Sequence, residues 1–378
     1  MSSKPRFVGE CRHVKLNEIC SKGKSSLRQK DVINDGPYSV YGASGVVGTT
    51  SDYQNEIPYV AVIKDGAGVG RASACEPMTS VLGTMQALIP NPNVERDYLL
   101  YLVRSLRLGE GFSGSTIPHI YFKDYGKIEV PLPSLEAQKR IVSQLGLIEA
   151  QIEQAEAQTT QLDQLVKSRF VEMFGDPVVN PKGWDVSTIK KTAITYGDGP
   201  FGSNLKSADY VLSGVRVIRL GNIMRGEFSE KDQSYVSYEK FESLRKYECI
   251  PGEVVIATLG DPILRACIVP DFGVPSIHKA DCMYYETNKE MVLPVFAMCA
   301  INQPSMLQRA LLDSHGQTRA RINSTQAGNL PMILPPMDLQ QEFADFAAQV
   351  DKSRFIAQQQ IEKLQMLYDS LAQDYFGD

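Results

Sequence analysis

The side chains of this chain best suited to chemistry are clustered polar and basic residues, whose types fit contact with nucleic acid. Arg reaches guanine edges, Asn and Gln reach adenine, and Lys and Ser hold phosphates. We predict DNA contacts in the first half of the chain at Lys22, Lys24, Ser25, Arg28, Lys30, Lys64 and Arg71. In the second half we predict them at Ser203, Asn204, Lys206, Arg216, Arg219, Asn222, Gln317, Arg319 and Arg321. For any one of these residues, an ordinary solvated surface is the alternative.

A glycine-rich loop at 65–70, with the sequence DGAGVG, follows an apolar run. A dinucleotide-binding fingerprint needs its third glycine one position later, where Arg71 stands. The segment 72–77 ends in Glu-Pro and does not support a following helix. The pattern therefore favours a tight hairpin. The cofactor loop remains as the alternative, and it would make the chain a self-sufficient S-adenosylmethionine-dependent DNA methyltransferase.

Catalytic and metal-binding signatures are missing from the sequence. There is no Asn/Asp-Pro-Pro-aromatic loop, no Walker A loop and no H-E-x-x-H motif. His13, His119, His278 and His315 stand apart without metal-ligand spacing. The 7 cysteines contain no C-x-x-C pair, which favours a reducing cytoplasm over a disulfide framework or a zinc site. We predict no catalytic residue, metal or cofactor for this chain.

The elements that must position these residues emerge from an internal repeat. At an offset of 202, residues 114–176 align with 316–378 without a gap. Gly114 and Thr116 fall on Gly316 and Thr318, and both copies end in Phe-Gly-Asp. The gapless register favours duplication over a chance likeness between two Gln/Ala-rich helices.

Each copy of the repeat contains a long apolar pattern with steps of three and four residues. This spacing is typical of a coiled-coil seam. Pro133 and Pro335 stand just before the two predicted helices, and Gly175 and Gly377 are suitable stops. Because each stripe is narrow, we expect the helices to pair. The predicted seam comprises Ile141, Leu145, Ile148, Ile152, Leu162, Val166, Phe343, Val350, Ile361, Leu364 and Leu371.

Composition places the remaining sequence in globular regions. The 378 residues suffice for two or three domains, and 43% hydrophobic residues exclude wholesale disorder. Apolar runs at 58–63 and 254–258 predict buried strands. No apolar run reaches the ~20 residues that span a bilayer, so we expect no membrane partner. The net charge of −5 argues against a purely electrostatic nucleic-acid binder, and the acidity lies mainly in the two helical segments.

With its two Leu-Pro-x-x-[Glu/Asp]-x-Gln openings, at Leu132 and Leu334, and its two helices ending in Phe-Gly-Asp, the chain resembles a specificity subunit of a type I DNA restriction–modification system. The resemblance covers the whole chain. It implies two target-recognition domains held by an antiparallel coiled coil, each reading one half of a split site in double-stranded DNA. It also implies a non-catalytic cytoplasmic subunit that recruits two methylation subunits, which carry S-adenosylmethionine, and restriction subunits.

The expected fold class is therefore α+β with a pseudo-twofold internal repeat, in which two globular target-recognition domains alternate with two long helices that pair as an antiparallel coiled coil. We expect recognition domains at 1–130 and 177–332, and helical spacers at 131–176 and 333–378. Residues 1–113 show little sequence similarity to residues 177–315, so we expect the two half-sites to differ. A coiled-coil scaffold without a nucleic-acid role is a further alternative.

Overall fold

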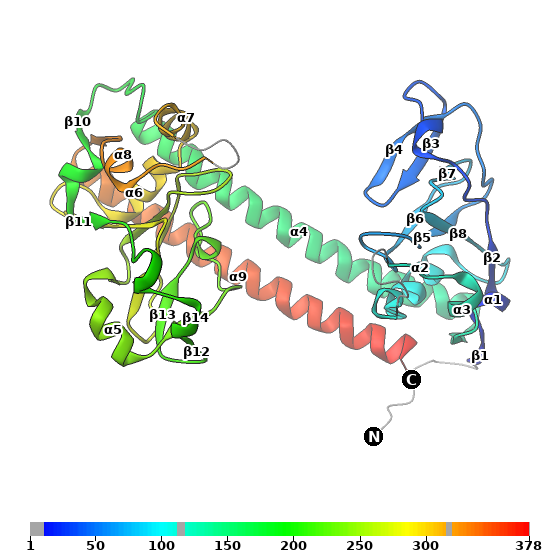
Figure 1. Ribbon diagram of the computed structural model, residues 1–378. Helices are drawn as coiled ribbons and strands as arrows, with labels where there is room; N and C mark the ends of the chain where they lie inside the picture. Colours follow the sequence, from blue (N-terminus) through cyan, green and yellow to red (C-terminus); the bar gives the residue numbers. More distant parts are fainter. Residues whose placement is uncertain (1–10, 112–117, 315–319, 378) are drawn as a thin grey trace. The chain divides into compact units, whose positions relative to one another are not determined.

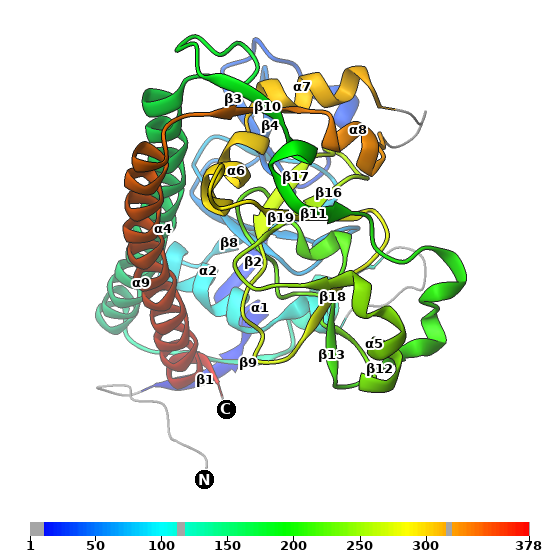
Figure 2. The ribbon, with the colours of Figure 1, turned by 90° about the vertical axis from the view of Figure 1, so that its left-hand side faces the viewer.

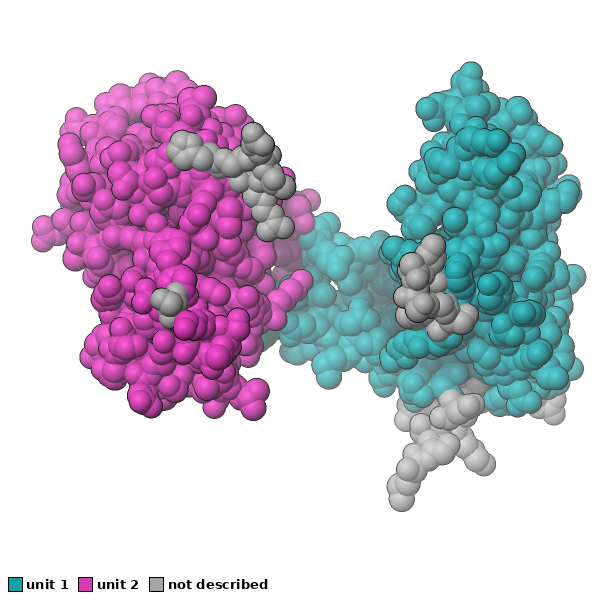
Figure 3. Space-filling model, in the orientation of Figure 1, with its two compact units in different colours: residues 1–157, 358–378 teal, residues 158–357 magenta. Residues whose placement is uncertain are grey.

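The computed structural model describes residues 11–111, 118–314 and 320–377 (Figure 1). The chain divides into two compact units, which Figure 3 draws in teal and magenta. Unit 1 contains residues 1–157 and 358–378, and unit 2 contains residues 158–357. Over the described ranges, no helix is both long and apolar enough to cross a membrane.

Unit 1 is built on an antiparallel four-stranded sheet with the strand order β2-β8-β5-β6. Strand β5 is apolar throughout because both of its faces are covered: Val60 and Val62 pack in the core that contains α2, and Tyr59 and Ala61 pack in a second core on the opposite side. The elements of unit 1 are β1 (Arg12–Lys15), α1 (Leu16–Ile19), β2 (Cys20–Lys22), η1 (Gln29–Asp31), β3 (Tyr38–Gly42), β4 (Gly45–Thr50), β5 (Tyr59–Ile63), β6 (Ala72–Cys75), β7 (Ser80–Val81), β8 (Met85–Pro90), α2 (Arg96–Ser105), η2 (Leu108–Glu110), α3 (Phe122–Tyr125), β9 (Glu129–Leu132) and the start of α4 (Leu135–Phe174).

Unit 2 repeats this plan with the strand order β11-β19-β16-β17. Its elements are β10 (Asp185–Thr188), η3 (Ile189–Thr192), β11 (Ala193–Gly197), η4 (Gly202–Asn204), η5 (Ser207–Asp209), β12 (Tyr210–Val211), β13 (Val215–Ile218), η6 (Leu220–Asn222), β14 (Ser234–Val236), α5 (Tyr238–Leu244), η7 (Arg245–Tyr247), β15 (Glu248–Cys249), β16 (Val254–Ala257), β17 (Arg265–Ile268), β18 (Ser276–His278), β19 (Cys282–Thr287), α6 (Pro294–Ile301), α7 (Pro304–Leu312), α8 (Ser324–Gly328), β20 (Pro331–Leu334) and the start of α9 (Met337–Phe376).

The repeat extends well beyond the helices that reveal it in the sequence. The two-stranded sheets β1-β9 and β10-β20 match, and each precedes a long helix. A parallel pair also recurs, β3 with β7 in unit 1 and β13 with β18 in unit 2. The units differ in the sheet that contains this pair, which has three strands in unit 1 and five in unit 2. The expected α+β fold with an internal repeat is confirmed.

One buried glutamine joins each long helix to its own globular core. The fully buried Gln138 donates to the carbonyls of Asn93 and Pro133, both at 3.0 Å, and accepts from the Glu95 N–H at 2.8 Å. Glu95 is the N-cap of α2, so the start of α4 is tied to the start of α2.

The matching residue in unit 2 is Gln340, which is also fully buried. It donates to the carbonyls of Met291 and Pro335 and accepts from the N–H of Leu293, the N-cap of α6. The glutamine of the repeated Leu-Pro opening is therefore a structural anchor in both units.

The long helices pair antiparallel within each unit. In unit 2, Arg169 near the end of α4 bonds to Glu342 near the start of α9 at 2.8 Å, and Asp163 pairs with Arg354 at 3.3 Å. There the end of α4 lies beside the start of α9 in both ribbon views (Figures 1 and 2). In unit 1, Gln144 bonds to Tyr375. Of the predicted seam, all eleven residues are buried or half-buried.

Each helix also ends inside a core. Phe174 of α4 and Phe343 of α9 lie in the main core of unit 2, with their ring centroids 5.6 Å apart. Phe376, the repeat counterpart of Phe174, packs on Tyr98 in the core of unit 1, at 5.6 Å. The repeated Phe-Gly-Asp ending is thus a helix end that completes a core, and Gly175 takes the positive φ of 76° that ends α4.

The substitution Gln138→Leu should lower the free energy of unfolding by about 2–4 kcal/mol, because it leaves buried backbone groups of 93, 95 and 133 without partners. Urea unfolding followed by circular dichroism measures the change. The matched control is Gln151→Leu, which changes an exposed glutamine of the same helix and should alter stability by less than about 0.5 kcal/mol. Equal unfolding midpoints for the two variants would contradict the anchoring role.

Candidate nucleic-acid interface

The same corner of the four-stranded sheet is framed by identical backbone bonds in both units. In unit 1 the Lys64 N–H donates to the Thr84 carbonyl, and the Ile120 N–H donates to the Lys64 carbonyl, both at 3.0 Å. In unit 2 the Thr258 N–H donates to the Asp281 carbonyl at 2.9 Å, and the Ile322 N–H donates to the Thr258 carbonyl at 3.0 Å. Lys64 thus corresponds to Thr258, and Thr84 to Asp281.

The residue before each of these isoleucines forms a bridge to the neighbouring hairpin. His119 bridges Asp65, and Arg321 bridges Leu259. The repeat offset of 202 also places His119 on Arg321. We call the surroundings of His119 corner 1 and those of Arg321 corner 2.

Corner 1 is a hollow of about 610 Å³ with basic and aromatic walls, lined by Lys22, Lys64, Asp65, Gly66, Thr84, Gln86, His119, Ile120, Tyr121 and Phe122. His119 Nδ1 lies 2.7 Å from Asp65 Oδ1, and its ring stacks near Tyr121 at 6.4 Å between centroids. The Lys22 ammonium lies 5.9 Å from the centre of the Phe122 ring. Such a mixture of cations and π faces suits contact with nucleic acid.

Corner 2 has the same kinds of groups from different residues. Arg321 bonds to Asp281 at 2.6 Å, and its guanidinium lies 5.7 Å from the centre of the Phe201 ring. Close by in sequence, Lys279 lies over Tyr210, with its ammonium 5.5 Å from the ring centre. The Arg321 side chain is half exposed, at 49%.

Next to corner 2, the buried His278 and the half-buried Asp198 have shifted pKa values. Burial lowers the pKa of His278 to about 4, so this imidazole is neutral at physiological pH. Burial also raises the pKa of the Asp198 carboxyl above its usual value. The positive charge of corner 2 therefore comes from Arg and Lys side chains and not from His278.

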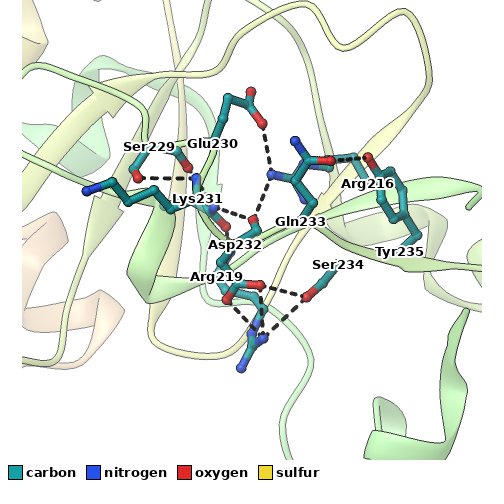
Figure 4. Close-up of polar contacts among 10 residues, drawn as sticks. Arg216, Arg219, Ser229, Glu230, Lys231, Asp232, Gln233, Ser234 and Tyr235 are labelled. Carbon is teal, nitrogen blue, oxygen red and sulfur yellow. Dashed lines mark hydrogen bonds and ion pairs between the residues drawn. The ribbon is translucent and has the colours of Figure 1, made fainter. Parts of the chain in front are cut away.

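Beside β13, three of the predicted DNA contacts hold the segment 229–235 (Figure 4). Arg216 is 1% exposed, bonds to the Glu230 carboxylate at 3.1 Å and to the Asp232 carbonyl at 2.8 Å, and lies against the rings of Tyr235 and Phe272. Arg219 pairs with the Asp232 carboxylate at 2.9 Å.

Asn222 is fully buried and holds the same segment. Its amide donates to the Ser229 and Asp232 carbonyls at 2.8 and 2.7 Å, and its oxygen accepts from the Arg219 N–H. In this conformation Arg216 and Asn222 position a loop and do not present their polar atoms to a base edge. Both residues were predicted as DNA contacts, and their burial shows that neither side chain lies on the surface of the chain.

The other predicted contacts are distributed as follows. Lys22 and Lys64 line corner 1, and Arg321 lies at corner 2. Lys24, Arg28, Lys30, Arg71, Asn204 and Lys206 are exposed, and Arg28 pairs with Asp31. The Ser25 hydroxyl accepts from the Ala87 N–H, which gives it a structural bond. Gln317 and Arg319 lie outside the described residues, as does the side chain of Ser203.

Comparison with known proteins fits this architecture. Residues 10–164 match the model of the type I restriction modification DNA specificity domain. The chain is also 20% identical, over 83% of its length and 73% of the relative's, to the MjaIX specificity subunit of a type I restriction enzyme from Methanocaldococcus jannaschii. In sequence the chain is similar to type I restriction–modification specificity subunits.

Other known proteins are also similar to this chain. The MjaVIII specificity subunit of the same organism is 26% identical over 47% of the chain, and the match spans 46% of that relative. The fold resembles the crystal structure of the type I restriction–modification S subunit from M. genitalium, with a TM-score of 0.58, 14% identity and 99% coverage of both chains. A structure from work on complex assembly of the type I restriction–modification system gives a TM-score of 0.56 at 14% identity, with 97% of both chains covered.

The sequence-based prediction did not include several residues of the two corners. His119 and Asp65 are 54 positions apart, and neither has a neighbour in sequence that signals the pair. The two aromatic residues at 121–122 and the acid Asp281 were also missed. One signal could have found His119, because the repeat aligns it with Arg321, which the pattern of basic residues did select.

The substitution Asn222→Ala should lower the free energy of unfolding of unit 2 by about 1–3 kcal/mol, since it removes the donor to the Ser229 carbonyl and one of the two side-chain donors to the Asp232 carbonyl. The matched change Arg219→Ala removes a half-exposed ion pair and should cost less than about 1 kcal/mol. Thermal unfolding of both variants provides the comparison. A larger loss for Arg219→Ala would contradict the assignment of Asn222 as the buried support of segment 229–235.

Proposed function

We propose that this chain is a non-catalytic DNA-recognition subunit that reads a bipartite, asymmetric site in double-stranded DNA. The supporting observation is the pair of corners, in which one backbone frame holds different side chains in each unit. Equivalent frames suit equivalent tasks, and different side chains suit different half-sites. In this proposal the recognition domains are residues 1–130 and 177–332, and the helical segments 131–176 and 333–378 are spacers.

The proposal includes partners. Apolar side chains are exposed along the long helices at Leu147, Leu165, Phe355, Ile356, Met366 and Leu367. Exposed apolar groups on a helix are suited to contact with other proteins. We assign these faces to two methylation subunits, which would supply adenine methylation with S-adenosylmethionine, and to restriction subunits. We also propose that the complex is cytoplasmic, like its DNA target.

The charge of the two proposed recognition domains also favours DNA binding by an assembled complex over binding by this chain alone. Residues 1–130 carry 15 basic and 13 acidic side chains, and residues 181–330 carry 17 and 16. Domains this close to neutral gain little from counterion release on DNA. We therefore expect firm binding only when the methylation subunits are present.

The decisive experiment isolates the complex through a tag on this chain and incubates it with a library of random DNA duplexes at several salt concentrations. Sequencing of the retained duplexes should give one split motif, with affinity that falls steeply as salt rises. Equal retention of all sequences at every salt concentration would overturn the proposal. Methyl transfer to genomic DNA by the purified chain alone, with labelled S-adenosylmethionine, would instead favour the methyltransferase alternative.

Lengthening both helices tests the division between readers and spacers. Four residues inserted after Ala155 and four after Ala357 add about 6 Å to each helix, close to the length of two base pairs. The selected motif should keep both half-sites and gain roughly one or two base pairs in the gap. As a control, the same insertion after the exposed Ser44, in the β3–β4 turn, should leave the gap unchanged. Altered half-sites in the helix variant would contradict the assignment.

A further inference from the structure

The two corners share a three-part arrangement at the positions that the repeat makes equivalent. In corner 1, His119 contacts the Asp65 carboxylate through one ring nitrogen and stacks near Tyr121. In corner 2, Arg321 contacts the Asp281 carboxylate and lies over Phe201. The acids and the aromatic residues come from different elements in the two units. Each corner therefore combines a nitrogen-bearing side chain with a carboxylate and an aromatic ring, although the two units supply the acid and the ring from different elements.

The carboxylate gives each of these side chains a defined orientation. Its negative charge also lowers the net positive charge of the corner. A contact with a phosphate gains from net charge and tolerates a mobile lysine. A contact with a base edge needs a side chain held in one direction, with the support of a second residue. The arrangement of Arg321 fits the second case, because one part of its guanidinium is fixed by Asp281 while half of the side chain is exposed.

We propose that Arg321 reads a guanine in the half-site bound by unit 2, and that His119 is the corresponding specificity-determining residue in unit 1. Asp281 is a positioning residue that orients the guanidinium, and Phe201 supports its face. Guanine is the base assigned to Arg321 because its N7 and O6 accept the two parallel bonds that a guanidinium donates. This inference rests on the proposed function.

The principal test is the substitution Arg321→Gln in the tagged complex, selected on the same random duplex library. A glutamine amide pairs with adenine, so the preferred base at one position of one half-site should change from guanine to adenine. The discrimination lost at that position should be about 5- to 150-fold, and the other half-site should stay unchanged. Arg321→Lys, which keeps the charge but cannot form the two parallel bonds, should flatten the preference at the same position.

Further variants separate reading from folding and from charge. Arg309→Gln removes another half-exposed arginine of unit 2, which pairs with Asp313 at 2.8 Å, and should leave the motif unchanged. Asp281→Asn should weaken the guanine preference while affinity for unrelated duplexes rises, because a negative charge is lost. His119→Gln should alter only the half-site that Arg321→Gln leaves intact. Thermal unfolding of each complex confirms that the variants fold.

The outcomes of this experiment are distinct. If the unmodified complex selects no split motif, the proposed function itself fails. If it selects a motif that Arg321→Gln leaves intact, only the present inference fails. An equal loss of affinity for all sequences after Arg321→Gln would make Arg321 a phosphate contact and would also overturn the inference.

Discussion

The direction in which each long helix leaves its globular core depends on one buried amide. Gln138 and Gln340 each bond to two carbonyls and one N–H, and in both units that N–H belongs to the N-cap of the next helix of the core. A buried amide without partners is costly, so only one helix orientation satisfies all three bonds. This joint therefore fixes the direction of each long helix relative to the globular core of its own unit.

Both long helices contribute residues to both units, so the folding of the two units is linked. Unit 1 contains the start of α4 and the end of α9, and unit 2 contains the remainder of both helices. Phe376 completes a core whose other residues come mostly from positions before 146, and Phe174 completes a core built mostly from residues after it. Phe376 packs on Tyr98, and Phe174 packs on Phe343, so burial of these two rings stabilises contacts between residues that are far apart in the sequence.

The helices and the corners differ in how far the sequence predicts them. Burial every 3.5 residues gives a helix a regular apolar spacing, and the eleven seam positions predicted from that spacing are all buried or half-buried. The buried strand β5 was equally visible, because both of its faces are covered. The corner residues show no regular spacing in the sequence, because the His119–Asp65 contact forms only when the fold brings distant loops together. Asn222 shows that polar residues between apolar runs can also serve as buried supports for a loop.

The bonds that frame each corner run between backbone atoms, with Lys64 to Thr84 in one unit and Thr258 to Asp281 in the other. No side chain at these positions is needed to close the frame. Mutations can therefore replace the exposed side chains while the backbone frame stays stable. The side chains of each corner can change independently of those of the other corner. Such a molecule can evolve new recognition at low structural cost, one half at a time.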